Sequence, residues 1–156
     1  MTARRGLLRS RGQRGASAVE FALVVTPLLI LFFGMIQYGM YFYAAQVGSN
    51  VANGAARQLS VGNCQGAGAL QSYVDNNLGV ASTSSAVVTT RWKNVDGSSP
   101  ASPQAKNVTI GGSVVVSVSF RTLNMHLPLV PFLSDPRVER TVQARVEDTT
   151  DQGCGS

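Results

Sequence analysis

The chain has 156 residues, enough for one domain, and 44% of them are apolar while only 13% are charged. That composition excludes a disordered protein, and the charged fraction lies well below the roughly 25% usual for soluble domains. The formal charge of +5 belongs to the first fifteen residues, because residues 16–156 carry eight of the thirteen basic side chains and all eight acidic ones. Five arginines make up this basic arm: Arg4, Arg5, Arg9, Arg11 and Arg14. Beside an apolar run, such an arm indicates a cytoplasmic anchor rather than a nucleic-acid partner.

An apolar run follows the basic arm. Val19 to Tyr43 supplies 25 mostly apolar residues, and a helix needs about 20 to cross a bilayer. Aromatic residues crowd the far end of the run, as they do at membrane–water interfaces: Tyr38, Tyr41, Phe42 and Tyr43. We therefore expect a leader over residues 1–15 and a single membrane-spanning helix over residues 16–44, kinked at Pro27, which has no N–H to donate.

The helical pattern continues beyond the apolar run. An apolar stripe of mostly small residues recurs at spacings of three and four: Tyr41, Ala44, Ala45, Gly48, Val51, Ala52, Ala55 and Leu59. A polar stripe lies opposite: Gln46, Asn50, Asn53, Arg57 and Ser60. The pattern predicts an amphipathic extension over residues 45–62, ended by Gly62 and Asn63, so that residues 16–61 form one helix about 69 Å long. The apolar stripe would pack on the chain's own domain, on helices of other copies, or on both at different turns.

Residues 63–156 predict a separate α+β domain. A short amphipathic helix is expected over residues 67–78, with Gly79 as its C-cap. β-Branched and alternating runs predict strands at residues 86–92, 108–110, 113–121 and 138–147, the middle two paired as a hairpin across Gly111 and Gly112. Because apolar and polar residues alternate, an antiparallel sheet is favoured. The expected fold class is α+β: a long N-terminal helix, a short helix and a small antiparallel sheet.

The inventory for catalysis or metal binding is thin. His126 is the only histidine, no GxSxG motif is present, and the acidic residues near the C-terminus lack the spacing of a calcium loop. We therefore expect a structural protein with no catalytic residues, no cofactor, no metal and no small-molecule substrate.

The two cysteines, Cys64 and Cys154, form no CxxC pair. If the C-terminal part is exported, its compartment permits a disulfide between them. Such a bridge would tie the end of the long helix to the C-terminal tail. The alternative is two unrelated thiols.

The entry to the apolar run carries the most informative motif. The basic leader ends in Gly15, and Ala16, Ser17, Ala18, Val19, Glu20 and Phe21 follow before the run proper. This order resembles the processing signal of type IV pilin-like proteins, in which a prepilin peptidase cuts after the glycine. The stretch "GASAVEFALVVTPLLILFFGMIQYG" resembles more closely the TadE-like family, minor pseudopilins of the tight-adherence (Flp pilus) system. The specific part covers roughly residues 12 to 57, and Phe21 stands where Flp-type pilins usually carry a tyrosine.

The resemblance implies a role for each residue at this junction. Cleavage between Gly15 and Ala16 would remove the leader and create an α-ammonium, and Glu20 would become the fifth residue of the mature chain. In pilin-like assemblies this carboxylate is expected to pair with an ammonium as subunits leave the lipid; the alternative is a glutamate that reaches the cytoplasmic surface. The implied partners are the membrane, a prepilin peptidase and other pilin-like subunits. The implied location is the inner membrane, with the C-terminal domain extracytoplasmic, or a surface pilus.

Two other readings remain open. A secreted protein would lose an ordinary signal peptide, but the apolar run exceeds the usual 7–15 residues. A cut after Ala45 would also place Tyr43 where a small residue is needed. The second reading is a single-span anchor that carries a binding domain outside any pilus. The length lost on maturation separates the three.

Overall fold

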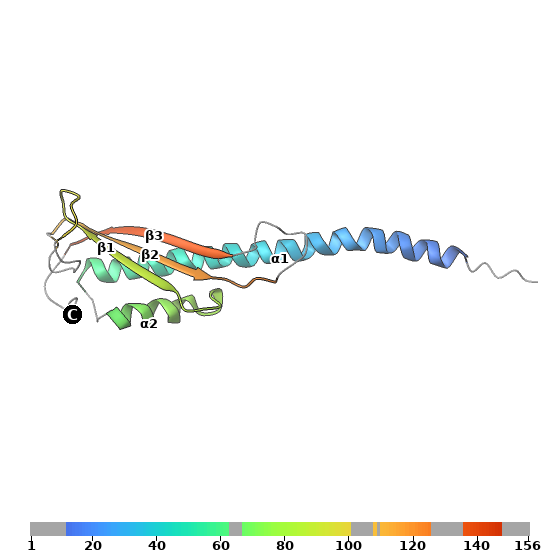
Figure 1. Cartoon of the computed structure of the whole chain (residues 1–156), viewed down its shortest axis with the longest axis horizontal. Helices are drawn as coiled ribbons and strands as arrows, with labels where there is room; N and C mark the ends of the chain where they lie inside the picture. Colours follow the sequence, from blue (N-terminus) through green and yellow to red (C-terminus); the bar gives the residue numbers. More distant parts are fainter. Residues whose placement is uncertain (1–11, 63–66, 101–107, 109, 126–135, 148–156) are drawn as a thin grey trace, which may run out of the picture.

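The computed structural model describes residues 12–62, 67–100, 108, 110–125 and 136–147. One helix, α1, spans Gly12–Ser60, and its N-terminal half extends away from a small domain (Figure 1). It begins four residues before the expected start and is about 73 Å long at 1.5 Å per residue. The helix ends as the sequence predicts, because Gly62 adopts a positive φ of 74° and donates its N–H to the carbonyl of Leu59 at 3.2 Å.

The second helix, α2, spans Ala67–Leu78, as expected, and a 3₁₀ turn, η1, follows at Gly79–Ala81. Gly79 has a φ of 47°, which suits a glycine at a helix end. Two side chains of α2 hold the backbone of Ala86 just before the first strand. The amide of Gln71 donates to the Ala86 carbonyl at 2.8 Å, and the Asp75 carboxylate accepts the Ala86 N–H at 2.9 Å. The start of the sheet is thereby tied to α2.

Three strands form one antiparallel sheet in the order β1-β2-β3, which confirms the α+β fold. They are β1 (Val87–Lys93), β2 (Ser113–Arg121) and β3 (Arg137–Arg145). In the central strand, Val118 lies opposite Val88 on one side and Arg140 on the other. The inner residues of β2 are fully buried while its outer residues are exposed or half-buried, as the alternation predicts.

The predicted hairpin between residues 108–110 and 113–121 is wrong. Val108 lies in a bend and Ile110 in a turn, and β2 pairs with β1 instead. Gly111 and Gly112 are engaged elsewhere: the Gly111 N–H donates to the carbonyl of Val146, and the Val146 N–H donates to the carbonyl of Gly112. These two bonds continue the pairing of β2 with β3 by one step beyond Ser113 and Arg145. The glycines therefore do not form the turn of a hairpin that leads into β2.

The core lies between the inner face of the sheet and the C-terminal half of α1, and the strands run alongside that half of the helix (Figure 1). The apolar stripe of α1 packs here, on the chain's own domain, with Ala44, Ala52 and Ala55 at 0% exposure. Gly48 allows the closest approach, because a Cβ built there would lie 2.8 Å from Cε1 of Phe120. Small residues on the helix therefore let a valine-rich sheet lie flat against it.

Candidate functional site: the uncovered part of helix α1

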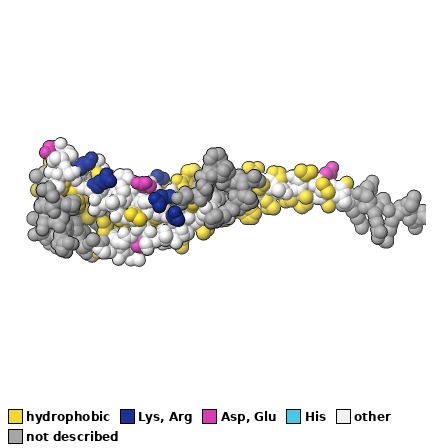
Figure 2. Space-filling model, in the orientation of Figure 1, with side chains coloured by type: hydrophobic (Ala, Val, Ile, Leu, Met, Phe, Trp, Pro, Cys, Tyr) yellow, Lys and Arg dark blue, Asp and Glu magenta, His cyan; other side chains and the backbone are white. Residues whose placement is uncertain are grey.

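The first half of α1 is largely uncovered within the described part of the chain. From residue 15 to residue 36 every residue except Gly34, which is buried, is exposed or half-buried, and many large apolar side chains are exposed, such as Phe21 (70% exposed), Leu23 (71%) and Met35 (75%). These twenty-two residues span about 33 Å, close to the roughly 30 Å of a bilayer's hydrocarbon core. Figure 2 shows this part of the helix as mostly hydrophobic surface. Its length and apolar surface fit a bilayer better than water.

Gln37 ends the uncovered stretch. Its side chain is 2% exposed and bonds the chain segment that leaves β2. Its amide nitrogen donates to the carbonyl of Leu123 at 2.8 Å, and its amide oxygen accepts the N–H of Met125 at 3.0 Å. The Gln37 amide thus satisfies one backbone carbonyl and one backbone N–H, as a neighbouring β-strand would. In the sequence, Gln37 is only a polar residue that interrupts an apolar run. That interruption was the one sign that its side chain has a polar partner.

Arg140 is a second residue that links the domain to α1, and the sequence did not predict this role. It occupies an inward-facing position of β3, between Val138 and Val142, and is only half-buried. Its Nε donates to the carbonyl of Ala45 in the middle of α1 at 3.3 Å. A charge on the inner side of an alternating strand was the signal that pointed to it. Together Gln37 and Arg140 bind the domain to α1 through polar bonds at the end nearest the uncovered helix.

The aromatic residues beyond Gln37 divide between the core and the surface. Tyr41 packs against the core, whereas Tyr38, Phe42 and Tyr43 are 37%, 62% and 55% exposed. Tyr41 and Phe42 make an edge-to-face contact with ring centroids 6.1 Å apart. Three amphipathic or aromatic side chains therefore stand free at the place where the uncovered helix meets the domain, which suits a membrane–water interface.

The predicted processing and assembly residues lie at the opposite end of the uncovered stretch. Gly15, Ala16 and Glu20 are all exposed on α1, and a Cβ built on Gly15 would meet nothing within 4 Å. Among the described residues, the Glu20 carboxylate has no hydrogen-bond or ion-pair partner. Positions 16 and 20 stand one turn apart on the same side of the helix, where their groups can meet.

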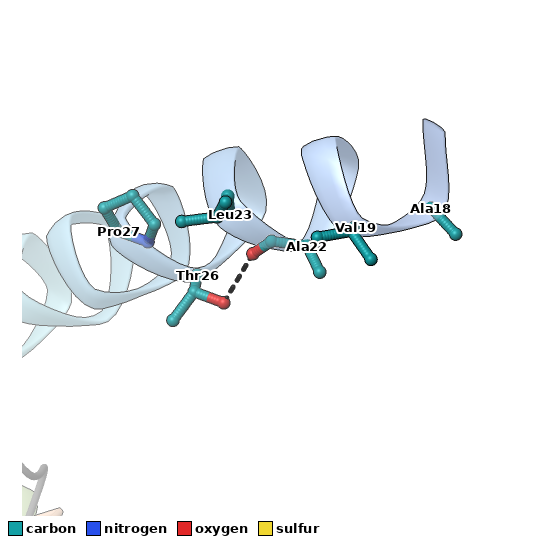
Figure 3. Close-up of a pocket in the computed structure, with 6 residues that line it drawn as sticks. All are labelled: Ala18, Val19, Ala22, Leu23, Thr26 and Pro27. Atoms are coloured by element: carbon teal, nitrogen blue, oxygen red, sulfur yellow. Dashed lines mark hydrogen bonds between the residues drawn. The ribbon is translucent and has the colours of Figure 1, made fainter. Parts of the chain in front are cut away.

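A shallow groove runs along the helix beside Glu20, from Ala18 to Pro27 (Figure 3). Its lining residues are Ala18, Val19, Ala22, Leu23, Thr26 and Pro27. The Thr26 hydroxyl donates to the Ala22 carbonyl at 2.7 Å, so this polar group is satisfied within the helix. Pro27 has no N–H, so the Leu23 carbonyl loses the donor that an ordinary residue would supply. Small residues at positions 18, 22 and 26, four apart, let a second helix approach closely.

Other residues named from the sequence fall outside the described part of the chain. They are Cys64, Cys154 and His126. Among the described residues, no cluster of three His, Cys, Asp or Glu side chains could hold a metal ion. The candidate site is a helix surface of apolar side chains with one exposed carboxylate, Glu20, at its entry.

Comparison with known proteins finds a similarity for one segment of this chain. No curated protein and no solved structure matches the chain. In the part of the chain that the structure describes, α1 is the one helix long and apolar enough to cross a membrane. Residues 15–57, which include the uncovered stretch and the first turns packed under the sheet, match the family model described as TadE-like protein, and this match confirms the resemblance over that segment.

Proposed function

We propose that this chain is a structural subunit of pilin type rather than an enzyme. It is anchored in the inner membrane by residues 15–36, carries its α+β domain on the extracytoplasmic side, and takes part in the assembly of tight-adherence (Flp) pili. A prepilin peptidase would release the leader between Gly15 and Ala16. The partners would then be the lipid bilayer, that peptidase and the N-terminal helices of other pilin-like subunits.

The observation that carries this proposal is the uncovered stretch itself. It joins three features on one helix: a bilayer-length apolar surface, an exposed Glu20 at its entry, and a domain fixed at its exit by Gln37. The TadE-like match covers the same residues. A helix that served only as the core of a soluble domain would bury its apolar side chains, and this one does so only beyond residue 36.

Glu20 would act through its charge. A carboxylate near the membrane interface is costly to desolvate, and an ammonium group is the partner that offsets the cost. Cleavage at Gly15 would create that ammonium on Ala16, one helical turn away, and would also place Glu20 near the positive end of the helix dipole. The same ammonium on a neighbouring helix could pair with Glu20 when subunits pack through the groove beside it.

The packing of α1 argues against an ordinary signal peptide. A cut after Ala45 would remove Gln37, Tyr41 and Ala44 from the domain. It would expose the fully buried surface that Ala44 now covers and break the bond that Gln37 makes to Leu123. A plain single-span anchor keeps all these contacts, so it is separated from the pilin reading by processing and assembly and not by the fold.

The test of the assembly role replaces Glu20 and follows assembly. We expect Glu20→Ala and Glu20→Gln both to insert into the membrane and to be cut at Gly15, because the junction is unchanged. Both should fail to co-purify with other pilus subunits, since glutamine keeps an acceptor but loses the ion pair. The control is Gln46→Ala, an exposed polar position on the same helix that should assemble normally. Wild-type assembly by both Glu20 variants would refute the role of the carboxylate.

A further inference from the structure

The outer face of the sheet, turned away from α1, concentrates basic side chains. Among the described residues, five of the seven Lys and Arg side chains that follow the leader lie on it, against one of the five acidic side chains, Glu139. The five are all exposed: Arg91, Lys93, Arg121, Arg137 and Arg145. Figure 2 shows dark-blue side chains over the sheet half of the molecule. We call these five residues the cationic face.

The strand register sets the spacing of this face. Lys93 and Arg145 both lie opposite Ser113, one on each side of β2, which separates their Cα atoms by about 10 Å. Arg91 follows one pleat along β1, about 7 Å away. Arg121 and Arg137 are cross-strand partners at the other end of the sheet, eight residues or about 27 Å along β2. The charges therefore mark both ends of a strip about 27 Å long and 10 Å wide.

Hydroxyl groups line the central row of the strip, and Val87, Val115 and Gln143 lie in the rows on either side of it. Thr89, Ser117 and Thr141 form one row across the three strands. The Ser117 and Thr141 hydroxyls are bonded to each other at 2.8 Å, and Ser119 lies in the next row, between Val87 and Glu139. These side chains are short, so the strip is flat, and each hydroxyl can both donate and accept hydrogen bonds. Among the outward-facing residues of the three strands none is aromatic.

The described carboxylates leave this face positive. Glu139 neighbours Arg137 on β3 and offsets part of the charge at that end. Asp96 lies in the turn after β1, where hydrogen bonds from the side chain and the backbone of Ser98 lower the pKa of its carboxyl. Glu147 lies two residues beyond Arg145, past the end of β3. Counted over the described residues, the strip thus carries five cations and one anion.

We propose that the cationic face binds a linear polysaccharide that carries carboxylate groups. Guanidinium and ammonium groups at the two ends of the strip would bind the carboxylates. The hydroxyl rows between them would exchange hydrogen bonds with sugar hydroxyls. A single-stranded nucleic acid fits the face less well, because such sites stack bases on aromatic side chains and this strip has none. The proposal is separate from pilus assembly, because it concerns the face of the sheet that α1 does not cover.

The test measures binding by the full-length protein in nanodiscs of zwitterionic phosphatidylcholine. The probes are fluorescent polygalacturonate, neutral dextran and a single-stranded DNA oligonucleotide. We expect polygalacturonate to bind, with an affinity that falls as salt rises from about 50 to 200 mM, as for other contacts to polyanions. Arg91→Gln should weaken binding and reduce the slope of log affinity against log salt by about 1, and adding Arg145→Gln should reduce it by about 1 more.

The matched control is Arg57→Gln. Arg57 is also an exposed arginine, but it lies on α1, away from the sheet. This variant should bind polygalacturonate as the wild type does. Arg91→Lys should keep most of the affinity, because it keeps the charge. The proposal is overturned by no binding, by equal binding of dextran, by tighter binding of DNA, or by an equal loss with Arg57→Gln. Unchanged circular dichroism of each variant shows that folding is not the cause.

Discussion

The side chain of Gln37 and the backbone of Leu123, 86 residues apart in sequence, are joined by a hydrogen bond of 2.8 Å. The same amide accepts the N–H of Met125 at 3.0 Å. The Gln37 side chain is buried, whereas Leu123 is 42% exposed and both bonds are part-buried, so water can replace them only in part. This pair of bonds defines how much of α1 remains outside the domain, and that remainder matches the thickness of a bilayer.

Replacing Gln37 by leucine should loosen this junction. Gln37→Leu leaves the Leu123 carbonyl and the Met125 N–H unpaired, so we expect the free energy of unfolding to fall by about 1–3 kcal/mol. The Met125 amide should exchange its hydrogen faster, which exchange measured by mass spectrometry or NMR would report. Gln46→Leu, at an exposed position of the same helix, is the control and should leave that amide protected. Equal protection of the Met125 amide in both variants would show that the two Gln37 hydrogen bonds do not stabilise the junction.

Gly48→Ala should weaken the contact between α1 and the sheet. The new Cβ would come within 2.8 Å of the buried Phe120 ring and 3.5 Å of Val138 Cγ1. Overpacking of this kind typically costs about 1–3 kcal/mol, more than the roughly 1 kcal/mol that alanine contributes to helix propensity. Gly68→Ala in α2 is the control, because a Cβ there meets nothing within 4 Å. Thermal unfolding should therefore shift down for Gly48→Ala and not for Gly68→Ala.

The disulfide between Cys64 and Cys154 stays a prediction, since both residues lie outside the described part of the chain. A bridge would close a loop of about ninety residues, which the chain-entropy model values at about 4–5 kcal/mol before any native strain. Peptide mapping of exported protein without reduction should find the two residues linked. Recovery of both as free thiols from oxidised, exported protein would contradict the prediction. If the two residues are linked, Cys64→Ser and Cys154→Ser should lower the unfolding temperature equally, because each removes the same bridge.

The sequence predicted the elements whose signals are local. The long apolar run, the alternation in β2 and the glycines at positions 62 and 79 each act within a few residues, and the structure places the elements where these signals indicate. The hairpin at Gly111 failed because a glycine pair permits a turn without deciding which strand it serves. That choice depended on Val146, 35 residues further along, whose backbone groups pair with both glycines.

The residues of the candidate site also divide into those with a local sequence signal and those whose role depends on distant contacts. Gly15, Ala16 and Glu20 form a contiguous motif, so the sequence alone could indicate them. Gln37 and Arg140 act on backbone atoms 86 to 95 residues away, and the pairing became visible only when the sheet was docked on the helix. The cationic face required the strand register, because its five residues are spread over three strands.

The most direct measurement of the pilin-type account is the mass and N-terminal sequence of the mature chain, recovered from the membranes of cells that contain a prepilin peptidase. We predict that the chain begins at Ala16, and that Gly15→Leu stays at full length because a pocket suited to glycine would reject the larger side chain. Gly12→Leu, three residues before the junction, should still be cut and serves as the control. A chain that keeps all of its leader, or one that has lost about forty-five residues, would contradict pilin-type processing.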